Sequence, residues 1–141
     1  MSFSNFYNLQ QKIGESTFST VYQASHRLTG KLVAVKIISK KLDEIPFFLR
    51  QECPSSNDPG LNLELYIQSV HQEIDIMKSI DHPNIVKLFD YFEDDDAFYF
   101  VQELCTRGDL ASYIKSNGLS NPREIQQIFL QIVNSVKYLH Q

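Results

Sequence analysis

The chain lacks the residue patterns that mark several common classes of protein. Its 141 residues contain two cysteines, Cys53 and Cys105, in no C-x-x-C pattern, so the sequence indicates neither a zinc site nor a disulfide framework. Lysine and arginine number 13 against 17 acidic residues, which gives a formal net charge of −4. Because phosphate binding needs a basic surface, this charge argues against nucleic acid as the main partner. An intracellular, reducing compartment, either cytoplasm or nucleus, is the simplest interpretation.

Long apolar runs are also missing. The longest apolar stretches are short and interrupted by lysine, so no segment is expected to span a bilayer and no membrane partner is predicted. The N-terminal segment MSFSNFYNLQQK has no apolar stretch of the kind found in secretory signals. The four histidines are scattered without metal-ligand spacing, so no metal site is assigned. What remains is the composition of one globular domain, with 43% hydrophobic and 21% charged residues.

Hydrophobic periodicity predicts a small sheet with one helix inserted in it. Apolar and β-branched runs predict five strands, at residues 6–13, 19–27, 31–39, 86–92 and 98–102. Between the third and fourth strands, apolar residues at steps of three or four predict a helix over residues 62–80, with a face made of Leu63, Ile67, Val70, Ile74 and Met77. The composition of residues 43–61, rich in proline and serine, predicts a flexible insertion before this helix.

Two further helices are predicted towards the C-terminus. The first covers residues 109–115, and the second begins with Asn121 as N-cap and Pro122 at its first position. The second helix carries an apolar stripe of Ile125, Ile128, Phe129, Ile132, Val136 and Leu139. The order of three strands, a helix, two strands, a connector and helices predicts an α+β fold with one five-stranded antiparallel sheet.

A glycine-containing loop joins the first two predicted strands. Its sequence is Ile13-Gly14-Glu15-Ser16-Thr17-Phe18-Ser19-Thr20-Val21. A loop that covers the phosphates of a nucleotide needs inward-facing backbone N–H groups and little side-chain bulk, which Gly14 offers. Serine-rich turns between strands are common, so an ordinary hairpin is the preferred interpretation of this loop when it is taken alone.

The third predicted strand carries a lysine in apolar surroundings. Lys36 follows Val33-Ala34-Val35, where an unpaired ammonium would be costly, so it needs a carboxylate or a phosphate as its partner. The alternative is a lysine whose charged end reaches solvent at a strand edge.

These two features resemble the start of a protein kinase domain, with its Gly-rich loop and V-A-I-K strand. The segments HPNIVKLFDYFED and ELCTRGDL extend the resemblance over residues 7–141 and make it most similar to calcium/calmodulin-dependent and checkpoint-type serine/threonine kinases. The resemblance implies a small lobe over residues 7–102, a hinge over 103–108 and the first two helices of a large lobe over 109–141. It also implies ATP as cofactor, Mg²⁺, a protein substrate, and transfer of the γ-phosphoryl group to serine or threonine.

The same resemblance implies roles for individual residues. Lys36 would contact the α- and β-phosphates and pair with Glu73 on the predicted helix, and these two are the catalytic candidates. Ala34 and Val21 would lie against the adenine, and Asp109 would reach the ribose. The full set of implied nucleotide-binding residues is Ile13, Gly14, Glu15, Ser16, Thr17, Phe18, Ser19, Thr20, Val21, Ala34, Lys36, Gln102, Glu103, Cys105 and Asp109. The alternative for Glu73 is a glutamate on a solvated helix surface.

The chain departs from the family pattern at three of these positions. Ser16 and Ser19 stand where the second and third glycines are usual, and each adds a Cβ that narrows the allowed backbone range. We therefore expect a stiffer loop and weaker phosphate contact. Gln102 occupies the gatekeeper position, at the back of the nucleotide pocket, where an apolar residue or threonine is more usual.

Three motifs that follow the long helix in the family, H-R-D, D-F-G and A-P-E, are absent from these residues. The catalytic aspartate and the magnesium ligands belong to those motifs, so we expect this chain alone to be inactive. The alternatives are a truncated, pseudokinase-like binding or regulatory module and an unrelated α+β interaction domain. The apolar stripe of the last helix predicts either a protein partner or self-association.

Overall fold

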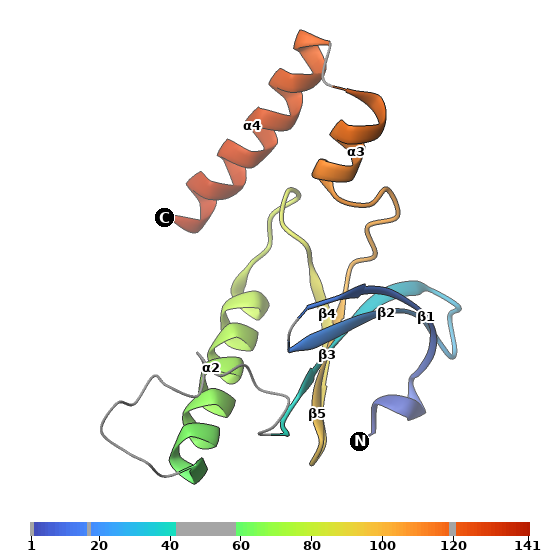
Figure 1. Ribbon diagram of the computed structural model, residues 1–141, viewed down its shortest axis with the longest axis vertical. Coiled ribbons are helices and arrows are strands. Elements are labelled where there is room, and N and C mark those ends of the chain that lie inside the picture. Colours follow the sequence, from blue (N-terminus) through green and yellow to red (C-terminus); the bar gives the residue numbers. More distant parts are fainter. Residues whose placement is uncertain (1, 17, 42–58, 119–120) are drawn as a thin grey trace. The chain divides into compact units, whose positions relative to one another are not determined.

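The computed structural model describes residues 2–16, 18–41, 59–118 and 121–141, apart from the side chains of residues 59–62. Residues 43–58 of the insertion predicted at 43–61, with Cys53, and the loop residue Thr17 lie outside the described residues. In chain order the elements are η1 (Phe3–Asn5), β1 (Tyr7–Glu15), β2 (Ser19–His26), β3 (Leu32–Ser39), α2 (Pro59–Ser79), β4 (Leu88–Glu93), β5 (Ala97–Gln102), α3 (Leu110–Asn117) and α4 (Pro122–Leu139) (Figure 1). No helix of the described residues is long and apolar enough to cross a membrane.

The five predicted strands are all present, and their ends differ from the predicted ones by no more than two residues. They form one antiparallel sheet in the order β1-β2-β3-β5-β4, which confirms the predicted fold class. Strand β3 lies in the middle of this sheet, and its register places Val21 of β2 opposite Lys36 and Gln102 of β5 opposite Ala34. The central strand therefore brings the candidate residues of three strands side by side.

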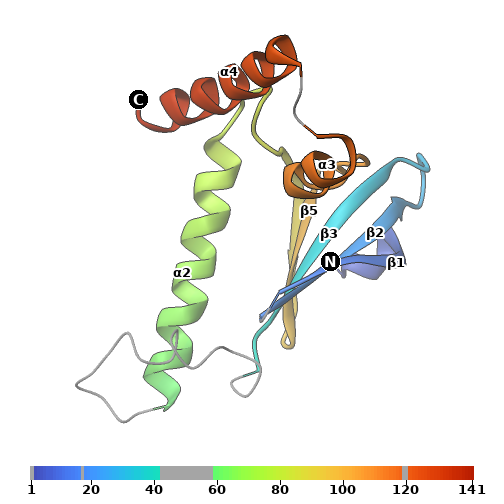
Figure 2. The same cartoon turned by 45° about the horizontal axis from the view of Figure 1, so that its top comes forward.

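Each face of the sheet has its own hydrophobic core. On one face, helix α2 runs along the strands (Figures 1 and 2), and Val70 and Ile74 pack with Ile38, Phe98 and Phe100. On the other face the core consists of Phe3, Tyr7, Ala24, Val33, Val35 and Val101. Because side chains alternate along a strand, Lys36 lies on the same face as Ile38, towards α2.

Helix α2 begins earlier than its apolar periodicity indicates. Its first residues are Pro59 and Gly60, which we assigned to the insertion, so that assignment is wrong for the last three residues of the predicted range, 59–61. Proline is tolerated in the first turn of a helix because the N–H that it lacks has no intrahelical partner there. The periodicity also missed Tyr66, which is buried beside Val70 and whose hydroxyl donates to the carbonyl of Ser39 at 3.4 Å.

The short helix η1 was not predicted. Its Phe3 is buried and stacks on Tyr99 of β5, with ring centroids 4.9 Å apart, and on Tyr7 at 5.5 Å. These contacts cover the face of the sheet that α2 leaves free. The signal in the sequence was the aromatic pair Phe3 and Phe6 before β1, and Phe6 stacks on Phe92 at 5.6 Å.

The chain divides into two compact units. The sheet unit contains Met1–Ser79 and Leu88–Leu104, and the second unit contains Ile80–Lys87 and Cys105–Gln141. Within the second unit, Tyr138 of α4 contacts the segment after α2: its hydroxyl accepts from the backbone N–H of Asp81 at 3.1 Å, and its ring lies 5.0 Å from that of His82. Helix α4 has Asn121 as its N-cap and Pro122 in its first turn, as predicted.

Candidate functional site

Lys36 and Glu73 form the predicted ion pair. The Nζ atom of Lys36 on β3 lies 3.1 Å from Oε1 of Glu73 on α2. The lysine side chain is 22% exposed and the glutamate 45%, so the pair is shielded but open to solvent on one side. Lys36 also lies 5.4 Å from the ring centroid of Phe100, its cross-strand neighbour. The alternative of a lysine extended into solvent is therefore wrong for this structure, and the ammonium is held where a second anion could reach it.

Gln102, at the candidate gatekeeper position, finds its partner on α2. Its amide nitrogen donates to the sulfur of Met77 at 3.8 Å, a weak hydrogen bond at the far end of the helix from the N-terminal turns. Met77 also packs against the core between α2 and the sheet. The sequence showed Met77 as an apolar residue of α2 but gave no sign that a glutamine amide would meet it.

Gly14 is not required by the fold around it. A Cβ added there would lie 3.6 Å from Cβ of Val21, which is ordinary van der Waals contact, and its φ is not in the left-handed region. A glycine that neither backbone strain nor crowding demands is consistent with close approach of a ligand to the backbone.

The two serines of the loop bond to each other. Their hydroxyl oxygens are 2.7 Å apart, the N–H of Ser19 donates to Oγ of Ser16 at 3.2 Å, and the N–H of Ser16 donates to the carbonyl of Ser19 at 2.8 Å. Phe18, between them, is partly buried and packs against the core under α2. Two backbone N–H groups of the loop are thus occupied within the loop itself, as a stiff turn requires.

The connector residues Glu103 and Cys105 are both exposed, and Cys105 is a free cysteine. Asp109, in the second unit, is the N-cap of α3: its carboxylate accepts from the N–H of Ser112 at 2.6 Å and from its hydroxyl at 3.1 Å. These hydrogen bonds, first that from the N–H, lower the pKa of Asp109. The sequence pattern suggested a ribose ligand and missed this capping role, which the spacing Asp-x-x-Ser could have indicated.

A cavity of about 480 Å³ lies beside the loop, but it does not coincide with the ion pair. Residues of the loop, of β3 and of the β4–β5 turn line it, among them Ser16, Ile37 and Asp96. Neither Lys36 nor Glu73 contributes to its wall. We therefore base the candidate site on the ion pair and its cross-strand neighbours and not on this cavity.

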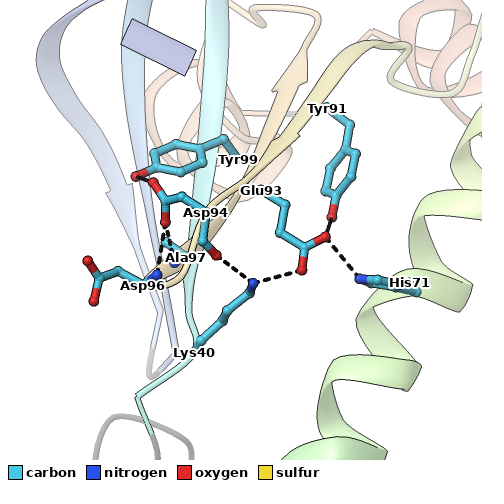
Figure 3. A network of polar contacts seen from close by, with 8 residues as sticks. All are labelled: Lys40, His71, Tyr91, Glu93, Asp94, Asp96, Ala97 and Tyr99. Carbon is cyan, nitrogen blue, oxygen red and sulfur yellow. Dashed lines mark hydrogen bonds and ion pairs between the residues drawn. The ribbon is translucent and has the colours of Figure 1, made fainter. Parts of the chain in front are cut away.

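A second polar network connects the middle of α2 with the end of β4 and the β4–β5 turn (Figure 3). Glu93, at the end of β4, binds Lys40 through Oε1 at 2.7 Å and His71 of α2 through Oε2 at 3.1 Å, and it accepts a hydrogen bond from the Tyr91 hydroxyl. Burial opposes ionisation of Glu93, but the hydrogen bonds from Lys40 and Tyr91 outweigh it and lower the pKa of the carboxyl. Burial and the hydrogen bond to Glu93 together raise the pKa of Tyr91.

The neighbouring Asp94 closes the β4–β5 turn. Its Oδ1 accepts from the N–H groups of Asp96 and Ala97, and its Oδ2 accepts from the Tyr99 hydroxyl at 2.9 Å. Burial opposes ionisation, but the Tyr99 and backbone hydrogen bonds prevail and the pKa of Asp94 is lowered, while burial and Asp94 raise the pKa of Tyr99 to about 12. The sequence led us to interpret residues 93–96 as a solvated turn. That interpretation is correct, since all four residues are exposed, but it did not include the contacts of Glu93 with Lys40 and with His71 of α2.

Comparison with known proteins places these features in one family. The family model described as the protein kinase domain matches residues 7–141. The serine/threonine-protein kinase SIK1 of Mus musculus is 35% identical over 136 residues, which cover 96% of this chain and 15% of that protein. Calcium-dependent protein kinase 3 of Plasmodium yoelii yoelii is 36% identical over 138 residues, covering 96% of this chain and 22% of that protein. The chain therefore spans about a fifth or less of the length of these relatives.

A solved structure shows the same fold. The crystal structure of Rad53 1-466 in complex with AMP-PNP matches 95% of this chain and 31% of that chain, with a TM-score of 0.74 and 28% sequence identity. Thus the fold, the sequence and the family model all agree.

Proposed function

Because this chain belongs to the protein kinase family and has serine/threonine kinases among its relatives, we propose that it forms the ATP-binding part of a serine/threonine kinase domain. The whole protein would transfer the γ-phosphoryl group of ATP to a serine or threonine of a protein substrate, and it would act in the cytoplasm or nucleus, where ATP is abundant. In this proposal Lys36 orients the phosphates and Glu73 holds Lys36 in place.

The observation that carries the proposal is the ion pair between β3 and α2. Lys36 lies on the central strand and is held by Glu73 of α2 at 3.1 Å. Its ammonium is therefore compensated and partly shielded from water, but a second anion can still reach it. The strand register supports a nucleotide surface beside this ion pair. Val21 of β2 lies opposite Lys36 of β3, and Gln102 of β5 lies opposite Ala34 of β3. The proposed nucleotide surface is therefore continuous over β2, β3 and β5.

We further propose that a polypeptide of these 141 residues binds ATP weakly and transfers no phosphoryl group. The described residues contain no group of three or more histidine, cysteine, aspartate or glutamate side chains able to hold a metal ion, and no step here depends on Mg²⁺. The loop supports weak binding, because the N–H groups of Ser16 and Ser19 already have partners. This observation also favours the second candidate, a pseudokinase-like binding or regulatory module.

Two measurements on the full chain test the proposal. On addition of ATP, backbone NMR signals of Val21, Ala34, Lys36 and Gln102 should shift together. Those of Phe89 in β4 and Leu28 in the β2–β3 turn should not. In parallel, incubation with Mg-ATP and either a basic peptide or casein should give no phosphate incorporation above that of a Lys36→Met control. Shifts confined to the cavity beside the loop would contradict the assigned surface. Turnover that Lys36→Met abolishes would contradict the inactivity.

A further inference from the structure

Helix α2 is held to the sheet on both sides of its buried stripe. Val70 and Ile74 form the middle of that stripe. At 3.6 residues per turn, His71 and Glu73 point about 160° apart around the helix axis, one on each side of the stripe. Glu73 binds Lys36 of β3, and His71 binds Glu93 at the end of β4.

The Glu93 side is more than a single contact. Lys40 binds the other oxygen of Glu93, donates to the carbonyl of Asp94, and lies 4.6 Å from the ring centroid of the fully buried Phe98. The ring of His71 meets the same Phe98 edge-on, with centroids 5.6 Å apart. Figure 3 shows Lys40 and His71 approaching Glu93 from opposite sides. The contact with Lys40 thus holds the Glu93 carboxylate at the sheet independently of its contact with His71 of α2.

Two anchors on opposite sides of a helix restrain its rotation. If α2 turned about its axis so that Glu73 moved away from Lys36, His71 would have to move relative to Glu93 as well. Each pair is partly exposed, so each alone stabilises its arrangement only modestly. Together with the stripe between them they define one orientation of the helix.

We propose that His71 and Glu93 are positioning residues that keep α2 in the orientation where Glu73 pairs with Lys36, a role that rests on the proposed nucleotide function of that pair. Neither residue touches the proposed nucleotide surface, because both lie across the buried stripe from Lys36. They act on Lys36 through the helix.

The test uses the full chain with four variants of α2, and a fifth variant, Lys36→Arg, assigns the reporter signal. His71→Ala removes the contact with Glu93, whereas His71→Gln retains an N–H donor at a similar distance from the backbone. Gln72→Ala, at an exposed position of the same helix, is the matched control. Glu73→Gln weakens the ion pair with Lys36 directly, so its spectrum gives the chemical shift of Lys36 when the pair is disrupted. The ¹³Cε resonance of Lys36, assigned with Lys36→Arg, reports the pair without any nucleotide present.

The proposal expects the Lys36 resonance in His71→Ala to move towards its position in Glu73→Gln, with His71→Gln and Gln72→Ala staying near the unmodified chain. Nucleotide affinity should fall about two- to fivefold in His71→Ala, the range that a partly exposed ion pair contributes. A Lys36 resonance unmoved in His71→Ala would overturn the proposal, even if the melting temperature fell, because the contact would then be structural only. If neither the unmodified chain nor any variant binds ATP, the proposed function fails. The Lys36 resonance still shows whether His71 positions the helix.

Discussion

The two compact units of the chain place their apolar side chains in opposite ways. In the sheet unit, hydrophobic residues are buried on both faces of the sheet, and Phe98 and Phe100 are 0% exposed. In the second unit, α3 and α4 contain no buried residue among those described, and Phe129 of α4 is 62% exposed. The sheet unit therefore has a core of its own, while the second unit presents an apolar helix surface.

This difference separates two properties of the chain. The stability of the proposed nucleotide surface should come from the sheet unit, which also holds Lys36, Glu73 and the Glu93 network. Association with other molecules should come from α4, because exposed apolar patches of this kind mark interaction surfaces or aggregation sites. Substitutions in the two units should accordingly change different measurements.

A matched pair of phenylalanines tests this separation most strongly. Phe98→Ala should lower the free energy of unfolding by about 3–5 kcal/mol, because it leaves a cavity between α2 and the sheet. Phe129→Ala, at an exposed position, should change it by no more than about 0.5 kcal/mol. Urea denaturation followed by circular dichroism measures both. Equal losses of unfolding free energy in the two variants would show that α4 is part of the same folding unit and would contradict the separation of the two units.

The second prediction concerns the surface of α4. Burial of one large apolar side chain is worth roughly 1.5–3 kcal/mol, and the stripe contains six. We expect the chain to self-associate or to bind a hydrophobic dye, and replacement of Ile128, Phe129 and Ile132 by serine to reduce both effects. The urea midpoint of the sheet should not change. A clean monomer without dye binding, seen by light scattering at high concentration, would refute the prediction.

The third prediction is a dependence of sheet-unit stability on pH. The pKa values of Glu93 and Asp94 are lowered in the folded chain, so the stabilisation from their ionised forms is present above their unfolded values and is lost as pH falls through the folded ones. The free energy of unfolding should therefore decline below about pH 4.5, where unfolded carboxyls begin to take up protons. Denaturation at several pH values measures the slope. The double variant Glu93→Gln/Asp94→Asn should have a shallower slope, and an unchanged slope would contradict the prediction.

The sequence predicted the fold and the ion pair well, for physical reasons that can be named. Strand β3 could be placed because its run of β-branched residues is buried on both faces, and Lys36 stood out because charge in such a run needs a partner. Glu73 followed from the family resemblance. The strands depend on patterns of residues close together in the chain, which one sequence displays directly, whereas Lys36 and Glu73 are 37 positions apart and only the resemblance paired them.

The parts that the sequence did not predict depend on contacts between distant residues. Glu93 and His71 are 22 positions apart, and Lys40 and Glu93 are 53 apart, so no local pattern pairs them. The acidic run at 93–96 has the composition of a solvated turn, as the structure confirms, but composition does not show which residues Glu93 contacts. Similarly, the aromatic contacts of Phe3 depend on the order of strands in the sheet, which brings Tyr99 beneath the N-terminus.

The smallest predicted effect concerns the loop. Restoring glycine at both Ser16 and Ser19 removes the hydrogen bonds of their hydroxyls and frees the backbone N–H of Ser19 to meet phosphates, while the bond from the Ser16 N–H to the Ser19 carbonyl remains. We expect the double variant to bind ATP about three- to tenfold more tightly, a gain of roughly 0.7–1.4 kcal/mol. Calorimetry measures the difference, with the control Ser4→Gly outside the loop. Affinity unchanged or weakened in the double variant would show that the serines do not hinder binding.

The affinity of the chain for an ATP analogue, measured by calorimetry with and without Lys36, tests the central claim most directly. The unmodified chain should bind with a Kd of roughly 0.1–1 mM, about 4–6 kcal/mol of binding free energy. Lys36→Met should abolish measurable binding, while Lys115→Met, an exposed lysine of α3, should leave the affinity unchanged. Equal affinities in the unmodified chain and Lys36→Met, or submicromolar binding by the unmodified chain, would contradict the claim that the Lys36–Glu73 pair forms a weak nucleotide site.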